Sequence, residues 1–432
     1  MKVCVLGLWH LGTVTAACLA SVGHDVIGLD FDPAVVAGLA AGRPPLFEPG
    51  LEDLVKAGFA SGRLRFTTDV AAAVASADVV WIAYDTPVDD EDRADVEYVI
   101  ERVTRLFPHL RHSALVLMSS QVPVGTTRRL EQAFASESRG RIVGFGYSPE
   151  NLRLGKAIGV FTQPDRVVVG VRRPSDREKV ATLLRPFTER IEWMSVESAE
   201  MTKHALNAFL ATSVTFINEI AALCEQVGAD ATEVERGLKS EVRIGPKAYL
   251  SPGSVFAGGT LARDVVFLSR LGQTHGVATH ILSSVKSSND AHRKWAERRL
   301  EQLLDGVSGK TVAIWGLTYK PGTDTLRRSS SVELCRWLTD RGATVRAHDP
   351  AVKTLPTDLA GHVRLVDSAL AAVEDASALV VSTQWPEYRQ IAAVDVSTRM
   401  VRRLVLDANR FTGETLGTGP GIEYLSVGRA GA

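Results

Sequence analysis

The chain has 432 residues, of which 45% are hydrophobic and 23% charged, and its formal net charge is -1. This length is too great for one ordinary hydrophobic core, so two or three domains are expected. The balanced charge, without a long basic run, argues against nucleic acid and anionic membrane surfaces as partners. No apolar run reaches the roughly 20 residues that a membrane span needs.

Cysteine usage favours a reducing cytoplasm. The chain has four cysteines, which are scattered through apolar segments: Cys4, Cys18, Cys224 and Cys335. Such spacing predicts neither a disulfide framework nor a metal site.

The first segments predict a β-α-β unit. The apolar run "KVCVLGL" (2–8) is interpreted as a buried strand, not a signal peptide. A helical pattern follows over 13–23, and a second apolar run over 24–30 ends in an acid. This is the start of a doubly wound parallel sheet. Further strands are expected within 77–84, 114–120, 141–149 and 166–171.

The pattern changes near residue 195. Residues 195–228 form a helical pattern with almost no turn signals, which predicts a long buried helix connecting two lobes. A second nucleotide-type pattern begins at 310–320 and continues through 343–350, 378–385 and 403–409. The tail, 417–432, is expected to be frayed. The predicted fold is α/β, with two doubly wound domains (1–194 and 299–432) joined by a central helical domain (195–298).

The stretch "GLWHLG", from Gly7 to Gly12, is close to the dinucleotide-binding pattern G-x-G-x-x-G. The first and third glycines are present, but Trp9 occupies the position of close approach to the pyrophosphate. Asp30 follows about twenty residues on, where it would bind a ribose diol and favour NAD over NADP. Two alternatives remain open: the indole points away and the pyrophosphate still lies at the helix N-terminus, or the cofactor is displaced or absent.

Eight stretches together carry a family resemblance: "GHDVIGLDFD", "LFEPGLEDL", "ADVEYV", "VPVGTT", "SPENLRLGKA", "AEMTKHALNAFLAT", "RIGPKAYLSPG" and "GLTYKPGTDTLR". Their order along the chain resembles that of the UDP-glucose/GDP-mannose dehydrogenase family. The resemblance implies an N-terminal Rossmann domain for NAD, a central domain that forms a homodimer, and a Rossmann-like C-terminal domain for a nucleotide sugar.

The resemblance also implies the catalytic residues. Lys203 and Asn207 match the lysine and asparagine that hold the reacting oxygens, and i, i+4 spacing puts both on one helix face. Asp264 matches an aspartate near the nucleophile, and Glu150 matches a glutamate of the active site. Glu150 could equally be an acid in the first turn of a helix. Thr260 stands at the position of the nucleophile itself.

The ligand-binding residues are likewise implied by the resemblance. Those expected to bind the cofactor are Gly7, Trp9, Leu11, Gly12, Asp30, Thr86, Pro87, Ser120, Gln121 and Arg327. Those expected to bind the substrate are Leu152, Arg243, Tyr249, Ser251, Gly253, Phe256, Gly258 and Lys320.

The chain departs from the family where the second oxidation takes place. Family members oxidise an alcohol twice, and the second step uses a cysteine thiolate, for which this chain has Thr260. A hydroxyl is a poorer nucleophile unless a strong base lies beside it. Leu154 replaces a second glutamate, Gln121 a threonine and Ser213 a second lysine.

The leading hypothesis is therefore an NAD-dependent oxidoreductase that removes two electrons, once, from a nucleotide-linked sugar or related nucleotide. Lys203, or a water held by Asp264, would take the proton. Three alternatives are kept: a redox-neutral epimerase or lyase, full oxidation to a uronate, and a nucleotide-sugar binder without activity.

Overall fold

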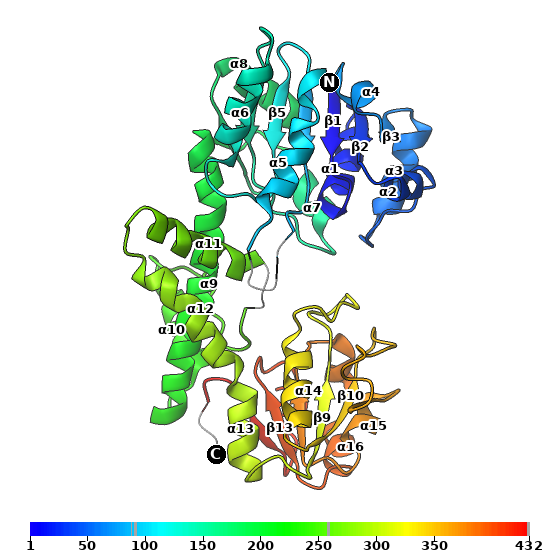
Figure 1. Ribbon diagram of the computed structural model, residues 1–432. Helices are drawn as coiled ribbons and strands as arrows, with labels where there is room; N and C mark the ends of the chain where they lie inside the picture. Colours follow the sequence, from blue (N-terminus) through cyan, green and yellow to red (C-terminus); the bar gives the residue numbers. More distant parts are fainter. Residues whose placement is uncertain (88, 90–92, 257–259, 430–432) are drawn as a thin grey trace. The chain divides into compact units, whose positions relative to one another are not determined.

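The computed structural model describes residues 1–87, 89, 93–256 and 260–429 (Figure 1). The chain divides into two compact units, Met1–Leu206 and Asn207–Ala432. The boundary falls within one long helix, α9 (Val196–Val227), which contributes residues to both. Each unit contains its own sheet and its own core.

The first unit is built on an eight-stranded sheet with the order β3-β2-β1-β4-β5-β6-β7-β8. The first six strands are parallel and follow the 3-2-1-4-5-6 order of a dinucleotide-binding fold. β7 runs antiparallel to β6, and β8 is parallel to β7. The strands are β1 (Lys2–Leu6), β2 (Asp25–Leu29), β3 (Leu64–Thr67), β4 (Val79–Ile82), β5 (Leu115–Met118), β6 (Gly144–Tyr147), β7 (Val167–Val171) and β8 (Ile191–Met194).

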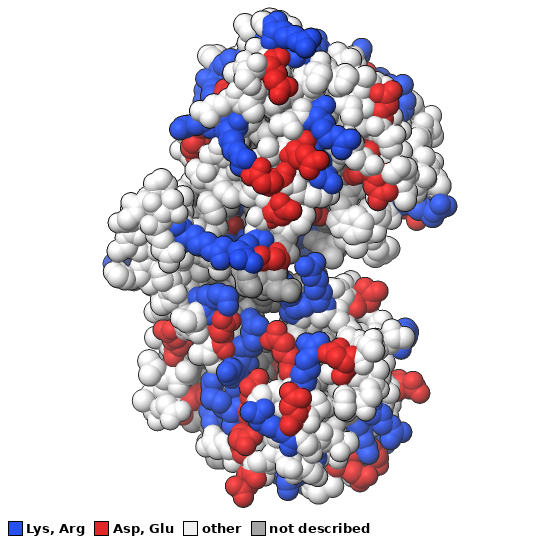
Figure 2. All heavy atoms as spheres, viewed as in Figure 1, with Lys and Arg blue, Asp and Glu red and all other residues white. Residues whose placement is uncertain are grey.

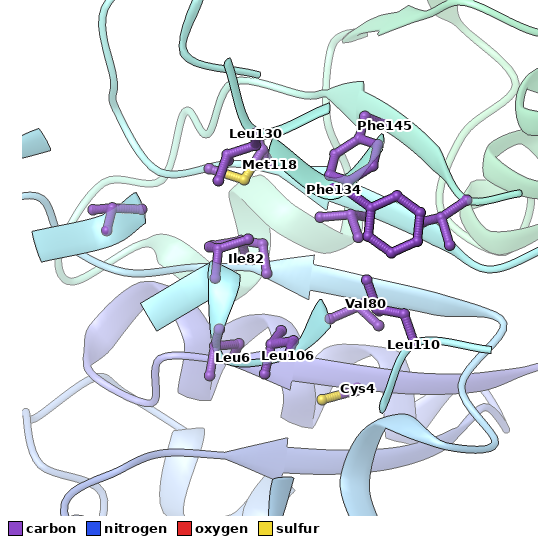
Figure 3. Close-up of a cluster of buried hydrophobic side chains, with 14 of the residues drawn as sticks. Cys4, Leu6, Val80, Ile82, Leu106, Leu110, Met118, Leu130, Phe134 and Phe145 are labelled. Atoms are coloured by element: carbon purple, nitrogen blue, oxygen red, sulfur yellow. The ribbon is translucent and has the colours of Figure 1, made fainter. Parts of the chain in front are cut away.

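Helices lie between these strands and bury the sheet. They are α1 (His10–Ser21), α2 (Pro33–Ala40), α3 (Leu51–Ala60), α4 (Val70–Val74), α5 (Val96–Thr104), η1 (Phe107–His109), α6 (Thr126–Glu137), α7 (Ala157–Thr162) and α8 (Pro174–Leu184). Figure 3 shows part of the core, where Leu6, Ile82 and Met118 from neighbouring strands meet Leu130 and Phe134 of α6. Central strands buried on both faces explain their unbroken apolar runs.

The second unit combines helices with a six-stranded parallel sheet. Its order, β11-β10-β9-β12-β13-β14, repeats the 3-2-1-4-5-6 arrangement of the first unit. The strands are β9 (Thr311–Trp315), β10 (Thr344–His348), β11 (Val363–Leu365), β12 (Ala378–Val381), β13 (Leu404–Asp407) and β14 (Glu423–Leu425). The helices after α9 are α10 (Ala231–Ser240), α11 (Thr260–Thr274), α12 (His280–Arg293), α13 (Trp295–Leu304), α14 (Ser330–Asp340), α15 (Ala369–Val373), η2 (Pro386–Gln390) and α16 (Ala393–Ser397).

These two sheets confirm the predicted pair of Rossmann-like domains. Helix α9 is the long helix predicted from residue 195 on, but the expectation that it is buried was wrong for one side, where Phe209 and Val227 are 71% and 75% exposed. The expectation of a frayed tail was wrong for its described part. β14 pairs with β13, Val427 is fully buried, and the N–H of Gly428 donates to Glu225. The "GTGPG" sequence that suggested fraying forms turns that lead into this edge strand.

Helix α9 is long and apolar enough to cross a membrane by length and composition alone, the one such helix among the described residues. About 44% of its most apolar window is buried inside the protein. The core helix of a protein that does not enter a membrane can have the same length and composition, so these two properties are weak evidence for a membrane span. On the visible surface of each unit, Lys and Arg are mixed with Asp and Glu (Figure 2).

Candidate active site

The phosphate loop of the first unit has the geometry that its glycines predict. Gly7 has φ of 90°, and its N–H donates to the carbonyl of Leu29 at 3.0 Å. A Cβ on Gly12 would collide with the backbone of Gly7, so a glycine is required for α1 to start this close to β1. Asp30 accepts the N–H of Leu8 at 2.7 Å, which fixes the carboxylate beside the loop. A carboxylate has about four acceptor positions, so Asp30 keeps capacity for a ribose hydroxyl.

Trp9 does not fill the loop. It is the N-cap residue of α1, its side chain makes no capping hydrogen bond, and it is 47% exposed. The first N–H groups of a helix lack intrahelical partners, so this uncapped end suits the pyrophosphate of a dinucleotide. Ser120, which follows β5, adds a fully buried hydroxyl for which the described residues supply no hydrogen-bond partner. The residues present therefore fit NAD.

Three of the other expected cofactor residues, Leu11, Thr86 and Gln121, lie within α1 or shortly after β4 and β5 of the first unit. Leu11 is buried in the first turn of α1. Thr86, which follows β4, donates its hydroxyl to the carbonyl of Gln121, which follows β5, at 2.8 Å. Pro87 is exposed. Arg327 is exposed in the second unit.

Helix α9 holds the loops of the first unit with three buried polar side chains. Glu200 accepts the N–H of Gly125 at 2.6 Å and both the N–H and the hydroxyl of Thr127, so it caps the start of α6. His204 lies 3.0 Å from the carbonyl of Val122. Lys203 is 7% exposed and therefore does not belong to a solvated helix face.

Lys203 is directed at the predicted glutamate. Its Nζ donates to the backbone carbonyl of Glu150 at 2.6 Å and lies 3.8 Å from the carboxylate Oε1. Oε2 of Glu150 accepts the N–H of Leu152 at 2.8 Å, which fixes the carboxylate in a tight turn. Glu150 lies in the loop after β6 and not in a helix, so its interpretation as an acid of a helical first turn was wrong.

One turn further along α9, Asn207 is 4% exposed and donates its amide to Oδ2 of Asp264 at 2.5 Å. Asp264 is fully buried in α11. Thr260 is the first residue of α11, four residues before Asp264, and it is exposed. The structure thus places Asn207 and Asp264 together, with Thr260 one turn away at the start of the same helix as Asp264.

None of the four cysteines can take the place of a nucleophile at Thr260. All four are free and buried. Burial raises the pKa of the Cys4, Cys18 and Cys335 thiols to about 12, so they remain protonated near neutral pH. Cys224 is packed in the hydrophobic core of the second unit, as its apolar context predicted.

The expected substrate residues are more scattered. Arg243 and Tyr249 are largely exposed, and Arg243 forms an ion pair with Glu241 at 2.9 Å. The hydroxyl of Ser251 donates to Glu235 at 2.7 Å. Phe256 and Gly253 are buried, and Lys320 is partly exposed after β9. Gly258 lies outside the described residues.

A cavity of about 160 Å³ opens at the carboxyl ends of β9 and β12 in the second unit. Ligands of open α/β sheets bind at this point, where the strand order reverses. Gly253 and Ser254 line the cavity together with Thr318 and Thr383.

Two groups of site residues were not predicted. Glu200 stands inside the quoted stretch "AEMTKHALNAFLAT", and an acid one turn before Lys203 in a largely apolar helical pattern was a usable signal. The structure shows that this acid is fully buried. The others are Asn218, Asn289 and Asn409, which contact the segment before α11 and come from three distant parts of the chain.

Comparison with known proteins identifies similar chains over the whole length. Residues 1–188, 197–291 and 313–414 match the NAD binding, central and UDP binding domains of the UDP-glucose/GDP-mannose dehydrogenase family. A UDP-glucose 6-dehydrogenase of Pseudomonas aeruginosa is 36% identical, over 99% of this chain and 98% of that protein. A UDP-glucose 6-dehydrogenase of Rhizobium meliloti is 34% identical, over 99% of this chain and 100% of that protein. The structure of a UDP-glucose dehydrogenase from Pyrobaculum islandicum has a TM-score of 0.88 and 32% identity, over 99% of this chain and 98% of that one.

Proposed function

Because this chain belongs to the UDP-glucose/GDP-mannose dehydrogenase family, we propose that it oxidises the primary alcohol of a UDP-linked hexose once and releases the aldehyde. The chain is an NAD-dependent oxidoreductase that acts on a CH–OH group of a nucleotide sugar. The matches do not favour a redox-neutral enzyme or a binder without activity. The UDP-glucose 6-dehydrogenases among its relatives make UDP-glucose the first substrate to test.

The observation that carries the single oxidation is the threonine at position 260 together with the burial of every cysteine. Its hydroxyl lies at an exposed helix start, and each cysteine of the chain is buried elsewhere. Oxidation of an aldehyde requires that a nucleophile or water first add to the carbonyl carbon, because only the tetrahedral adduct carries a hydride to transfer. A thiolate does this readily, whereas an unactivated threonine hydroxyl does not.

In this proposal, the first oxidation depends on Lys203 and Asn207. Bound NAD would accept the hydride, and the alcohol would lose one proton to the protein or to water. Lys203 and Asn207 project from one face of α9, and each donates through nitrogen to a neighbouring oxygen. Such donors stabilise the alkoxide that forms as the proton leaves. Lys203, or a water held by Asp264, would take that proton.

The test is a comparison of the unaltered protein with Thr260→Cys, using NAD and UDP-glucose. We expect the unaltered protein to form one NADH for each sugar, with a product lighter by two hydrogens. Thr260→Cys should form a second NADH and some uronate, because it restores a thiol at the start of α11. Thr260→Ser is the matched control, since it keeps a hydroxyl and should still stop at the aldehyde. A uronate from the unaltered protein would refute the proposal.

We also propose a homodimer that forms along α9. Phe209, Phe216 and Leu223 recur every seven residues on this helix, and they are 71%, 47% and 61% exposed. Val227 follows one turn later and is 75% exposed. An apolar seam of this period matches the same seam on a second helix, and a second copy of the chain supplies one. Sedimentation of Phe216→Glu should show a monomer where the unaltered chain is a dimer.

The four free, buried cysteines support the expectation that the protein works in a reducing cytoplasm.

A further inference from the structure

The segment 250–256, which leads towards α11, is held in place by side chains and belongs to no helix or strand. Asn218 of α9 accepts the N–H of Gly253 at 2.9 Å. Nε2 of His292, at the end of α12, lies 2.8 Å from the carbonyl oxygen of Gly253. Both backbone polar groups of this one residue are therefore bound by side chains from two different helices.

The next residue, Ser254, is bound by a side chain that follows a strand of the second sheet. Asn409, which lies two residues after β13, accepts the N–H of Ser254 and donates to its hydroxyl, both at 2.8 Å. Gly253 makes this approach possible, because a Cβ at that position would collide with the Asn409 amide. Gly253 is thus needed for the contact with Asn409, whatever else it binds.

Asn289 of α12 completes the set. Its Oδ1 accepts the N–H of Phe256 at 3.1 Å, and its Nδ2 donates to the carbonyl of the same residue at 3.0 Å. Asn289 is 2% exposed. It pairs with Phe256 as a neighbouring strand would, and so satisfies backbone groups that have no sheet partner.

Asparagine suits this task because its side chain carries an acceptor and two donors on one planar group. The whole chain has only five asparagines: Asn151, Asn207, Asn218, Asn289 and Asn409. Three of the five bind the segment 250–256. Such a concentration of a scarce residue type indicates that the conformation of this segment is itself important.

We propose that Asn218, Asn289 and Asn409 are positioning residues that hold 250–256 in the shape that receives the nucleotide part of the substrate. The inference rests on the proposed function and on the expectation from the sequence that Ser251, Gly253 and Phe256 bind the substrate. Gly253 and Ser254 also line the cavity at the carboxyl end of the second sheet. A segment that is ordered in advance binds without the entropic cost of ordering it at that moment. The three asparagines should therefore control substrate affinity and leave the rate of hydride transfer nearly unchanged.

The first test is Asn409→Leu, which keeps the shape of the side chain and removes both hydrogen bonds. We expect the KM for UDP-glucose and the Kd for UDP alone to rise about thirtyfold, since two hydrogen bonds of about 1 kcal/mol each are lost. The kcat should change less than about twofold, because no group that touches the reacting carbon is altered. Thr412→Val is the matched control. Thr412 also follows β13. Its substitution removes a buried hydrogen bond from the Thr412 hydroxyl to Asp407 and does not touch 250–256.

Aspartate substitutions give a sharper test of the two contacts. In Asn409→Asp the carboxylate still accepts the N–H of Ser254, and the Ser254 hydroxyl can turn to donate to the other oxygen. In Asn289→Asp the second oxygen faces the carbonyl of Phe256, which cannot donate. We therefore expect Asn409→Asp to restore a KM close to that of the unaltered protein, and Asn289→Asp to raise the KM as Asn409→Leu does. Equal effects of the two aspartates would refute the assigned contacts.

Hydrogen exchange at the backbone amides separates this inference from the proposed function. The N–H groups of Gly253, Ser254 and Phe256 should exchange slowly in the unaltered protein, and that of Ser254 should exchange faster in Asn409→Leu. Faster exchange with an unchanged KM would overturn the positioning role and leave the proposed function intact. If the unaltered protein bound no UDP and oxidised no UDP-sugar, the proposed function would fall, and this inference with it.

Discussion

The two Rossmann-like sheets of this chain are built around the same turn. Gly7 follows β1 with φ of 90°, and its N–H donates to the carbonyl of Leu29 at the end of β2. Gly316 follows β9 with φ of 90°, and its N–H donates to His348 at the end of β10. A left-handed residue is needed at both places because the chain must reverse against a neighbouring strand.

The acid after the second strand is also shared. Asp30 accepts the N–H of Leu8 at 2.7 Å and also the N–H of Asp32, two residues after itself. Asp349 accepts the N–H of Leu317 at 2.7 Å and, in the same way, the N–H of Ala351, two residues after itself. An acid at the end of the second strand is therefore part of the turn in both sheets, and by itself it is no evidence of a ribose site.

The difference lies in the helix that follows. In the first sheet α1 begins three residues after the glycine, and its N-cap, Trp9, makes no side-chain bond to it. In the second sheet α14 begins fourteen residues after the glycine, at Ser330, and Ser329 caps it by accepting the N–H of Ser331. Only the first sheet thus presents an open helix end beside its turn. The position of the helix, more than the glycine or the acid, distinguishes a dinucleotide site from a structural copy of it.

The largest effects, on NAD affinity and on stability, should come from replacing Gly12 of the first sheet's turn or Gly316 of the second sheet's turn by alanine. In Gly12→Ala the new methyl collides with the Gly7 backbone and displaces α1 from the loop. We expect NAD affinity to fall about a hundredfold or more, as two hydrogen bonds to a charged phosphate are lost. In Gly316→Ala the methyl collides with Thr383, and the second unit should lose about 2 kcal/mol or more.

Titration with NADH fluorescence and thermal unfolding of both variants measure these effects. Gly316→Ala is the control for Gly12→Ala, because it strains the equivalent turn without touching the cofactor loop. If Gly316→Ala weakened NAD binding as much as Gly12→Ala did, the contrast between the two turns would be wrong.

The sequence predicted the strands that are buried on both faces and left out those at the sheet edges. β4 and β5 are apolar throughout, and β1 and β9 are apolar after their first residue, so the length and composition of these runs identify them. The edge strands β3, β8, β11 and β14 have three or four residues and mix polar with apolar side chains. Such short segments become strands only because a neighbouring strand is available, and a single sequence does not contain that information.

The same limit applies to the candidate site. Lys203, Asn207 and Asp264 could be proposed because they stand in recognisable stretches, and the helix period places two of them on one face. The contacts of Asn289 and Asn409 with the segment before α11 join residues 33 and 155 positions apart. No local pattern links such positions, because the fold alone brings them together. The role of each remains a prediction until the variants are measured.

A smaller effect is expected from the two shared acids. Asp349 is 4% exposed and binds five donors, among them Trp385 Nε1 at 3.0 Å, whereas Asp30 binds two backbone N–H groups. Asp349→Asn places an amide donor against other donors, so the second unit should lose about 3 kcal/mol. Asp30→Asn should lose less stability.

Cofactor choice separates the two acids further. Asp30→Asn should raise the kcat/KM with NADP relative to NAD, because a negative charge no longer opposes a 2′-phosphate. Asp349→Asn should leave that ratio unchanged. Steady-state rates with both cofactors decide the point, and a ratio that moves equally in both variants would mean that Asp30 has no role beyond the turn.

The smallest effect concerns the residue before each acid, which is Leu29 in the first sheet and His348 in the second. Burial lowers the pKa of His348, although the neighbouring carboxylates of Asp349 and Glu387 oppose the shift. The folded protein thus favours the neutral imidazole, while the unfolded chain takes up a proton near its ordinary pKa of about 6.5. The stability from this group is complete above about pH 6.5 and is lost as the pH falls below it. His348→Leu, which copies the first sheet, should make the Tm of the second unit fall less between pH 7 and pH 5.5. Calorimetry at the two pH values measures the difference, and an unchanged slope would mean that His348 already carries its proton in the fold.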